Sequence, residues 1–257
     1  MRRRLRKGIF LLPTSLTVAN LFCGFWAIIG SMQGKLELAA MLIGMAILFD
    51  LLDGRVARMA NATSEFGKEF DSLADVVSFG VAPGVMLFAW GLHMLDKFGW
   101  SACFLFVICG TMRLARFNIQ ETVVDKKFFV GLPIPAAAGV PAALVFMFPE
   151  PLTSTTQTLP VLVLVVILAL LMVSTLRYYS FKDFDLRSRQ SYMTILFLAL
   201  LFVAIGSHPQ TMFLALSGAY MMSGPALKAY SLLRRGHLKT ETPKKPLPPP
   251  AREELDG

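Results

Sequence analysis

Residues 49–80 read FDLLDGRVARMANATSEFGKEFDSLADVVSFG, and this stretch decides how the chain is organised. Its four aspartates are Asp50, Asp53, Asp71 and Asp75, and they lie inside sequence that is otherwise largely hydrophobic. Residues three or four positions apart are neighbours on one face of a helix, so Asp50 and Asp53 share a face. Asp71 and Asp75 do the same on the next helix. The spacing therefore predicts two helices that each present two carboxylates.

A turn predicted at Asn61–Ser64 joins these helices and brings their acidic faces together. Four carboxylates at membrane depth cannot all stay charged without cations, because desolvation and mutual repulsion oppose the charge. Ligands that are all carboxylate oxygens favour a hard divalent ion, so we predict bound Mg²⁺ or Mn²⁺. The alternative is a polar hairpin in which Gly54, Ala57 and Gly67 allow close helix packing. Such packing requires the small residues but not the four carboxylates.

Composition places the chain among membrane proteins with several spans. Of its 257 residues, 55% are hydrophobic and 16% are charged, and its mean hydropathy is positive. A net charge of +8 would indicate a nucleic-acid partner in a soluble protein. Here the positive-inside rule accounts for the charge, and we predict no nucleic acid. Cys23, Cys103 and Cys109 lie in apolar stretches without metal or disulfide spacing, which favours a packing role.

Eight hydrophobic segments predict an all-α integral membrane protein, a polytopic bundle of about eight transmembrane helices. The basic start followed by an apolar run is similar to a signal peptide, but no small-residue cleavage site follows, so we predict an uncleaved first helix. A span requires about 20 apolar residues, which makes the fifth and seventh segments short. The segments cover residues 9–33, 37–60, 67–94, 98–120, 131–149, 158–180, 190–206 and 209–232.

The distribution of basic residues predicts the orientation of the bundle. All of the 25 lysines and arginines except Lys35 and Lys97 fall on one set of termini and loops. By the positive-inside rule, both termini and the aspartates face the cytoplasm, in the cell (inner) membrane. We expect a transmembrane domain over residues 1–235. The proline-rich, charged residues 236–257 are expected to form a disordered cytoplasmic tail.

The acidic stretch resembles the signature of the CDP-alcohol phosphatidyltransferase family, and all eight fixed positions of that signature are present. The resemblance implies that the four aspartates hold two metal ions and that the lipid substrate is CDP-diacylglycerol. It implies that Gly54 lets the helix approach the cytidine, and that Arg58 and Ser64 contact the nucleotide phosphates. Asp75 would be the general base that takes the proton from the incoming alcohol. The signature positions are Asp50, Asp53, Gly54, Ala57, Arg58, Gly67, Asp71 and Asp75.

Three further strings resemble the branch of this family that makes phosphatidylserine. They are PTSLTVANLFCG at 13–24, RLARFN at 113–118 and FVGLPIPAA at 129–137. The resemblance covers about the first 145 residues. It implies transfer of the phosphatidyl group from CDP-diacylglycerol to L-serine with release of CMP, in phospholipid biosynthesis. It also implies a homodimer in the lipid bilayer.

Serine offers a carboxylate and an ammonium for recognition. Arg113 and Arg116 lie one helical turn apart and are suited to bind the carboxylate, with Arg116 favoured because it lies inside the RLARFN string. Asn118 or Asn20 would accept a hydrogen bond from the ammonium. The alternative is that both arginines are interface charges that fix the topology.

Two other functions remain open at this point. The first is a sister enzyme that uses another alcohol, or an archaeal CDP-lipid as an archaetidylserine synthase does. The second is an ion-coupled transporter whose aspartates form an ion path. The aspartates cluster near one membrane face rather than at the midplane, and the sequence contains no paired broken helices. Both observations favour the enzyme.

Overall fold

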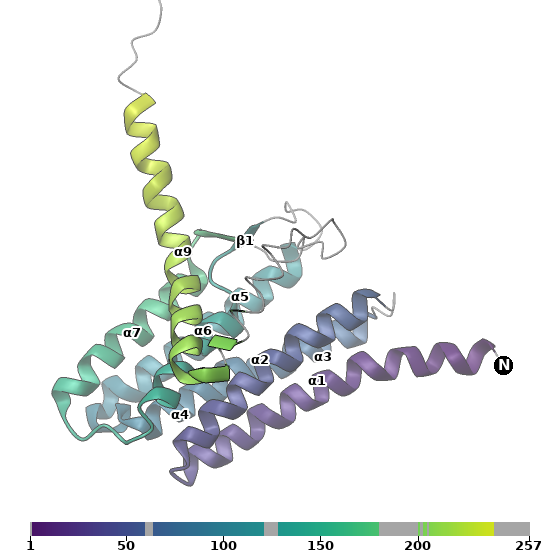
Figure 1. The fold of residues 1–257 in the computed structure, drawn as a ribbon, viewed down its shortest axis with the longest axis horizontal. Coiled ribbons are helices and arrows are strands. Elements are labelled where there is room, and N and C mark those ends of the chain that lie inside the picture. The colour runs from purple at the N-terminus through teal and green to yellow at the C-terminus, as the bar shows by residue number, and fades with distance from the viewer. Residues whose placement is uncertain are drawn as a thin grey trace, which may run out of the picture.

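The computed structural model describes residues 2–59, 64–120, 128–179, 200, 203–204 and 206–238. These residues form a helical bundle with one small two-stranded ladder (Figure 1). Residues 61–63 of the turn predicted at Asn61–Ser64 lie outside the described residues. So do most of the apolar segment 190–206 and the tail from residue 239 onward.

Two long helices open the chain as an antiparallel pair, α1 (Arg2–Met32) and α2 (Leu36–Met59). Their contact is lined with small side chains, among them the buried Ala27, Ala39 and Ala40, so the two backbones can approach closely. The helix α3 (Glu65–Asp75) packs against α1, so α1 contacts both α2 and α3. This arrangement places the acidic ends of α2 and α3 next to each other.

The helix α3 begins at an N-cap, because the Ser64 hydroxyl accepts a hydrogen bond from the backbone N–H of Gly67 at 3.0 Å. It continues without a break into a π-helical segment, η1 (Val76–Val81), and then into α4 (Ala82–Trp90). A short 3₁₀ turn, η2 (Leu92–Leu95), leads into α5 (Asp96–Gln120). The π-helical segment follows Asp75 directly, and such segments are frequent at functional sites.

The remaining elements surround α6 (Ile134–Met147), whose alanine-rich sequence is largely buried. It packs against α2, α7 (Thr155–Val173) and α9 (Pro209–Leu238). The strand β1 (Phe128–Val130) pairs antiparallel with β2 (Arg177–Tyr179). The buried Tyr178 hydroxyl donates to the backbone carbonyl of Met221 at 3.3 Å, which anchors the ladder to α9.

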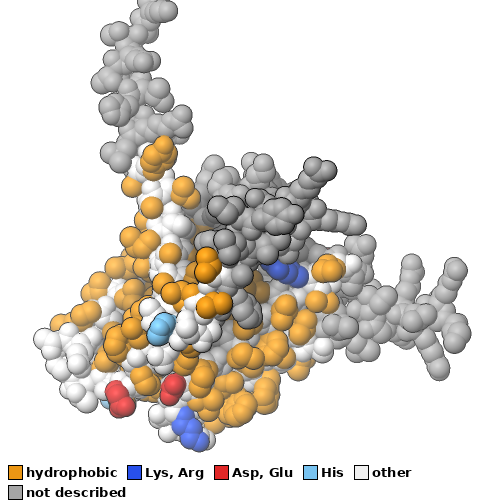
Figure 2. All heavy atoms as spheres, in the orientation of Figure 1, with side chains coloured by type: hydrophobic (Ala, Val, Ile, Leu, Met, Phe, Trp, Pro, Cys, Tyr) orange, Lys and Arg blue, Asp and Glu red, His pale blue; other side chains and the backbone are white. Residues whose placement is uncertain are grey.

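The described surface is that of a membrane protein. Large apolar side chains such as Phe22, Trp26 and Phe104 are exposed on it, and Figure 2 shows hydrophobic side chains over much of the face in view. Four helical stretches are long and apolar enough to cross a membrane: Thr14–Met32, Glu65–Trp90, Leu92–Ile119 and Thr155–Val173. The helix α2 is not among them, since Glu37, Asp50 and Asp53 interrupt its apolar sequence.

The expectation of a helical membrane protein is confirmed, while the count of eight spans and the orientation stay predictions. Seven of the eight segments fall on described helices. The predicted end of the segment 158–180 is wrong. The helix α7 ends at Val173, because Ser174 adopts an extended backbone and Arg177–Tyr179 pair with β1 instead. Within the part of the chain that the structure describes, the short β1–β2 ladder interrupts the predicted all-α structure.

Candidate active site

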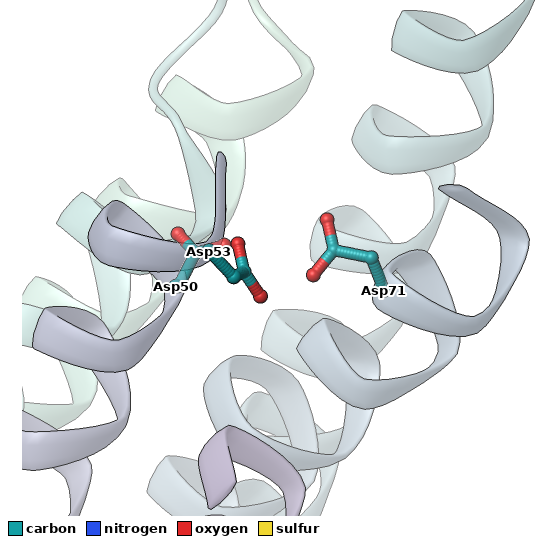
Figure 3. A group of neighbouring side chains, drawn as sticks. All are labelled: Asp50, Asp53 and Asp71. Carbon is teal, nitrogen blue, oxygen red and sulfur yellow. The ribbon is translucent and has the colours of Figure 1, made fainter. Parts of the chain in front are cut away.

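Three carboxylates converge between α2 and α3. Asp50 and Asp53 project from α2 toward Asp71 of α3, as Figure 3 shows. One carboxylate oxygen from each residue lies within 4.8 Å of the other two. Asp53 is buried, and Asp50 and Asp71 are half-buried. The two acidic faces predicted from residue spacing therefore do meet.

Asp75 lies one turn beyond Asp71, at the last position of α3, and is only 6% exposed. Among the described residues, it is not part of the group of three whose oxygens lie within 4.8 Å. Its charge still interacts with those of Asp50, Asp53 and Asp71. Its Oδ1 accepts a hydrogen bond from Nδ2 of Asn20 at 3.2 Å. The predicted set of four thus divides into three clustered carboxylates and a fourth, also buried, that lies outside that group.

The cluster fits a divalent cation. Two oxygens that bind a small hard cation from opposite sides at about 2.1 Å are about 4.2 Å apart, and the three oxygens here all lie within 4.8 Å of one another. Oδ1 of Asp71 is buried and has no hydrogen-bond partner among the described residues. A buried carboxylate oxygen of this kind is costly unless a cation or donor satisfies it. The donor set consists of oxygens alone, which suits Mg²⁺ or Mn²⁺.

The residues predicted to contact the nucleotide lie around the same helix ends. Gly54 follows Asp53 on α2 and is half-buried. Ser64 caps α3, so its hydroxyl oxygen is engaged with the backbone of Gly67. Arg58 lies on α2, but its side chain is outside the part of the chain that the structure describes.

The guanidinium of Arg116 lies among backbone carbonyls. Its Nη1 donates to the backbone carbonyl of Val173 at 3.1 Å, and its Nη2 donates to the carbonyl of Val130 at 2.9 Å. Nη2 also lies 3.3 Å and 3.4 Å from the carbonyl oxygens of Met172 and Ser174. The guanidinium therefore ties α5 to the end of α7 and to β1.

Gly131 makes this tie possible. Its backbone has a φ of +80°, a conformation that residues other than glycine rarely adopt. A Cβ atom there would lie 2.7 Å from Nη2 of Arg116 and would also collide with the Met172 carbonyl. The predicted role of Arg116 in binding serine gains no support from this geometry, because both of its terminal nitrogens already donate to the backbone.

We expect Arg116→Ala to destabilise the fold rather than to act on serine selectively. Hydrogen bonds to a charged group each contribute about 1.5–3 kcal/mol, and the substitution leaves several carbonyls without their donor. Thermal unfolding of the purified protein in detergent should show a clear drop in Tm, with Arg55→Ala, an exposed arginine of α2, as the control. An unchanged Tm together with a selective rise in the KM for serine would restore the sequence-based assignment.

Arg113, one turn earlier on α5, is the arginine that lies beside the acidic cluster. It is 6% exposed, and its Cζ lies 5.4 Å from the centre of the Phe117 ring. Its charge interacts with those of Asp75 and Asp50 and with the hydroxyl of Tyr220 on α9. Sequence reasoning missed Tyr220, since no motif links α9 to the acidic stretch. Among the described residues of the site, Arg113 is the buried cation.

The two asparagines proposed from the sequence both border the cluster. Nδ2 of Asn118 donates to Oγ of Ser72 at 2.9 Å, which connects α5 to α3 beside Asp71. Asn20 is fully buried on α1 and donates to Asp75. The other side-chain atom of Asn20, Oδ1, has no hydrogen-bond partner among the described residues. Asn20 therefore presents an unused acceptor next to Asp75.

Fold and site together define a class: a helical membrane protein with a cluster of carboxylates from two helices that could hold a cation. Residues 10–175 match the family model described as CDP-alcohol phosphatidyltransferase. The chain belongs to the CDP-alcohol phosphatidyltransferase family. This confirms the resemblance drawn from the eight signature positions.

Relatives from bacteria and yeast carry one name, CDP-diacylglycerol–serine O-phosphatidyltransferase. The protein of Helicobacter pylori is 37% identical over 197 residues, which is 76% of this chain and 83% of that protein. The Bacillus subtilis protein is 35% identical over 137 residues, or 53% of this chain and 76% of its own length. The Saccharomyces cerevisiae protein is 39% identical over 145 residues, about half of each chain.

Proposed function

We propose that this chain is a phosphatidyltransferase that makes phosphatidylserine from CDP-diacylglycerol and L-serine and releases CMP, in phospholipid biosynthesis. The observation that carries the proposal is the convergence of Asp50, Asp53 and Asp71 in a chain whose relatives are named for this reaction. The serine hydroxyl attacks the β-phosphorus of CDP-diacylglycerol. The bond from that phosphorus to the bridging oxygen breaks, and CMP leaves with the oxygen.

The four aspartates have two roles, cation binding and proton transfer. Asp50, Asp53 and Asp71 would hold the divalent cation, with Asp75 completing the set if two ions bind. When bound, Mg²⁺ or Mn²⁺ neutralises negative charge on the diphosphate. Asp75 accepts the proton of the serine hydroxyl as that oxygen attacks phosphorus. Its burial beside the cluster supports this role, because a carboxylate that is shielded from water takes its proton from the bound alcohol rather than from solvent.

The nucleotide is bound by the groups that the family signature provides. Gly54 has no side chain on the α2 surface, which lets the cytidine approach the backbone. Arg58 would pair with the phosphates through its planar guanidinium, and the Ser64 hydroxyl can donate to a phosphate oxygen while it caps α3. The assignments of Gly54 and Arg58 rest on the match to the signature, and that of Ser64 rests on the wider resemblance to the family.

For serine, we assign the carboxylate to Arg113 in place of Arg116. Arg113 is buried near Asp75, so a carboxylate bound to it would hold the serine hydroxyl close to the base. Oδ1 of Asn20 would accept from the ammonium, since it is buried and has no hydrogen-bond partner in the described part of the chain. Asn118 is the second candidate for that contact.

The test is a headgroup panel on the wild type and on Arg113→Ala, with CMP release from CDP-diacylglycerol as the readout. The wild type should use serine and reject ethanolamine, glycerol 3-phosphate and inositol, which lack the amino-acid carboxylate. Arg113→Ala should raise the KM for serine by roughly tenfold or more, because a charged hydrogen bond is lost, and should leave the KM for CDP-diacylglycerol nearly unchanged. Arg55→Ala is again the matched control.

Each contrary result points to a specific alternative. Preference for another alcohol, or for an ether-linked CDP-lipid offered in parallel, would favour a sister enzyme. Absence of CMP release with every alcohol would favour a transporter. A serine KM that does not change in Arg113→Ala would remove that residue from the site.

The membrane arrangement is part of the proposal. Eight spans would place both termini and the aspartates at the cytoplasmic face of the cell membrane, as the basic residues of the loops indicate. The transmembrane domain would cover residues 1–235, followed by the proline-rich tail 236–257. A homodimer is expected from the family.

A further inference from the structure

Two residues of α1 that are not among the eight signature positions contact the acidic site. Thr17 and Asn20 lie about one turn apart on α1 and are 5% and 0% exposed. Oγ1 of Thr17 donates to Oδ2 of Asp53 at 3.1 Å, and Nδ2 of Asn20 donates to Oδ1 of Asp75 at 3.2 Å. One face of α1 therefore holds a carboxylate of α2 and a carboxylate of α3 at once.

A third and a fourth contact fix where α1 crosses the π-helical segment η1. Oγ of Ser78 donates to the backbone carbonyl of Asn20 at 3.0 Å. One turn further along α1, a Cβ atom on Gly24 would lie 2.6 Å from the Cα of Ser78, so the crossing is too close for any larger residue. The backbone of α1 is thereby held against the segment that follows Asp75.

These contacts restrict the rotation of the two carboxylates. A carboxylate on its own rotates about its last side-chain bond with little preference. The donor from Thr17 engages one oxygen of Asp53, and the donor from Asn20 engages one oxygen of Asp75. Each hydrogen bond opposes that rotation and so fixes the direction in which its carboxylate faces. Removal of a group that hydrogen-bonds to a metal ligand and orients it commonly lowers the metal affinity by about 10–100-fold.

We propose that α1 is the positioning element of this active site, with Thr17 and Asn20 as positioning residues that orient Asp53 and Asp75. Thr17 acts on the cation through Asp53, and Asn20 acts on the proton-accepting carboxylate. The inference rests on the proposed function for what Asp75 does, but the role of Thr17 in cation binding does not depend on which alcohol is used.

The experiment measures Mn²⁺ binding to the purified protein by electron paramagnetic resonance, without substrate. Thr17→Val keeps the shape of the side chain and removes the donor, so Mn²⁺ affinity should fall by about tenfold or more. Thr17→Ser keeps the hydroxyl and should bind Mn²⁺ like the wild type. Ser31→Ala is the control, because the Ser31 hydroxyl on the same helix donates to the carbonyl of Ala27 and not to the cluster.

A second readout separates positioning from a general loss of structure. In Thr17→Val, kcat should recover as the Mn²⁺ concentration is raised, while the KM for serine stays near its wild-type value. A variant that is merely unstable would not recover in this way. Should Thr17→Val fail to fold, Thr17→Ala removes the same donor from a smaller side chain and is tested in its place.

Mn²⁺ affinity equal to that of the wild type in both Thr17→Val and Thr17→Ala would overturn the inference. Equal losses in Thr17→Val and Thr17→Ser would also overturn it, since the hydroxyl would then not be the cause. If the wild type fails to use serine but Thr17→Val still binds Mn²⁺ more weakly, the proposed alcohol is wrong and the positioning role stands.

Discussion

Removal of divalent cations is expected to abolish CMP release completely, and addition of Mg²⁺ or Mn²⁺ should restore it. The reason lies in the charges that meet at the site. One carboxylate oxygen each from Asp50, Asp53 and Asp71 lie within 4.8 Å of one another. The substrate brings a further negatively charged diphosphate. Without a cation these charges repel, so the substrate phosphates cannot approach the base. The buried Oδ1 of Asp71 also lacks a hydrogen-bond partner among the described residues.

The measurement is CMP release after treatment with EDTA and removal of the chelator, with the residual metal content determined directly. Re-addition of each ion in a titration then shows which one supports turnover. The control is the melting temperature of the stripped protein, which separates loss of the cation from loss of the fold. Full turnover in a preparation with no measurable metal would refute the cation site.

Asp75→Asn is expected to lower kcat by about 10²-fold or more. The amide has nearly the shape of the carboxylate and keeps one oxygen, but it cannot accept the proton of the serine hydroxyl at neutral pH. The substitution leaves the three clustered carboxylates of α2 and α3 intact. Binding of CDP-diacylglycerol should therefore be affected far less than turnover.

Steady-state kinetics with saturating serine, together with a direct binding measurement for CDP-diacylglycerol, test this expectation. Glu37→Gln is the matched control, because Glu37 is an exposed acid at the opposite end of α2. Turnover near the wild-type rate in Asp75→Asn would reassign this carboxylate to a structural or ligand role and leave the general base to be found elsewhere.

Much of this architecture was open to prediction because its causes are local. Long apolar runs predict membrane helices, and the described helices fall on seven of the eight predicted segments. The spacing of Asp50 and Asp53, and of Asp71 and Asp75, follows the helical repeat, so the pairing of residues on each face needed no structure. The polar residues of the first helix also carried information. Thr17 and Asn20 are three positions apart and share a helix face, so they could have been recognised from the sequence as one polar group.

What the sequence by itself determined is therefore the set of helices, the carboxylates that they carry and the family to which the chain belongs. Only the tertiary structure distinguishes the surroundings of Arg113 from those of Arg116. They lie almost one turn apart on one helix, and Arg116 is engaged by the carbonyls of Val130 and Val173, which lie 14 and 57 positions further along the chain. The same holds for the hydrogen bond from Thr17 to Asp53, which spans 36 positions. Helical periodicity relates residues within one helix, whereas contacts between helices depend on how the whole bundle packs.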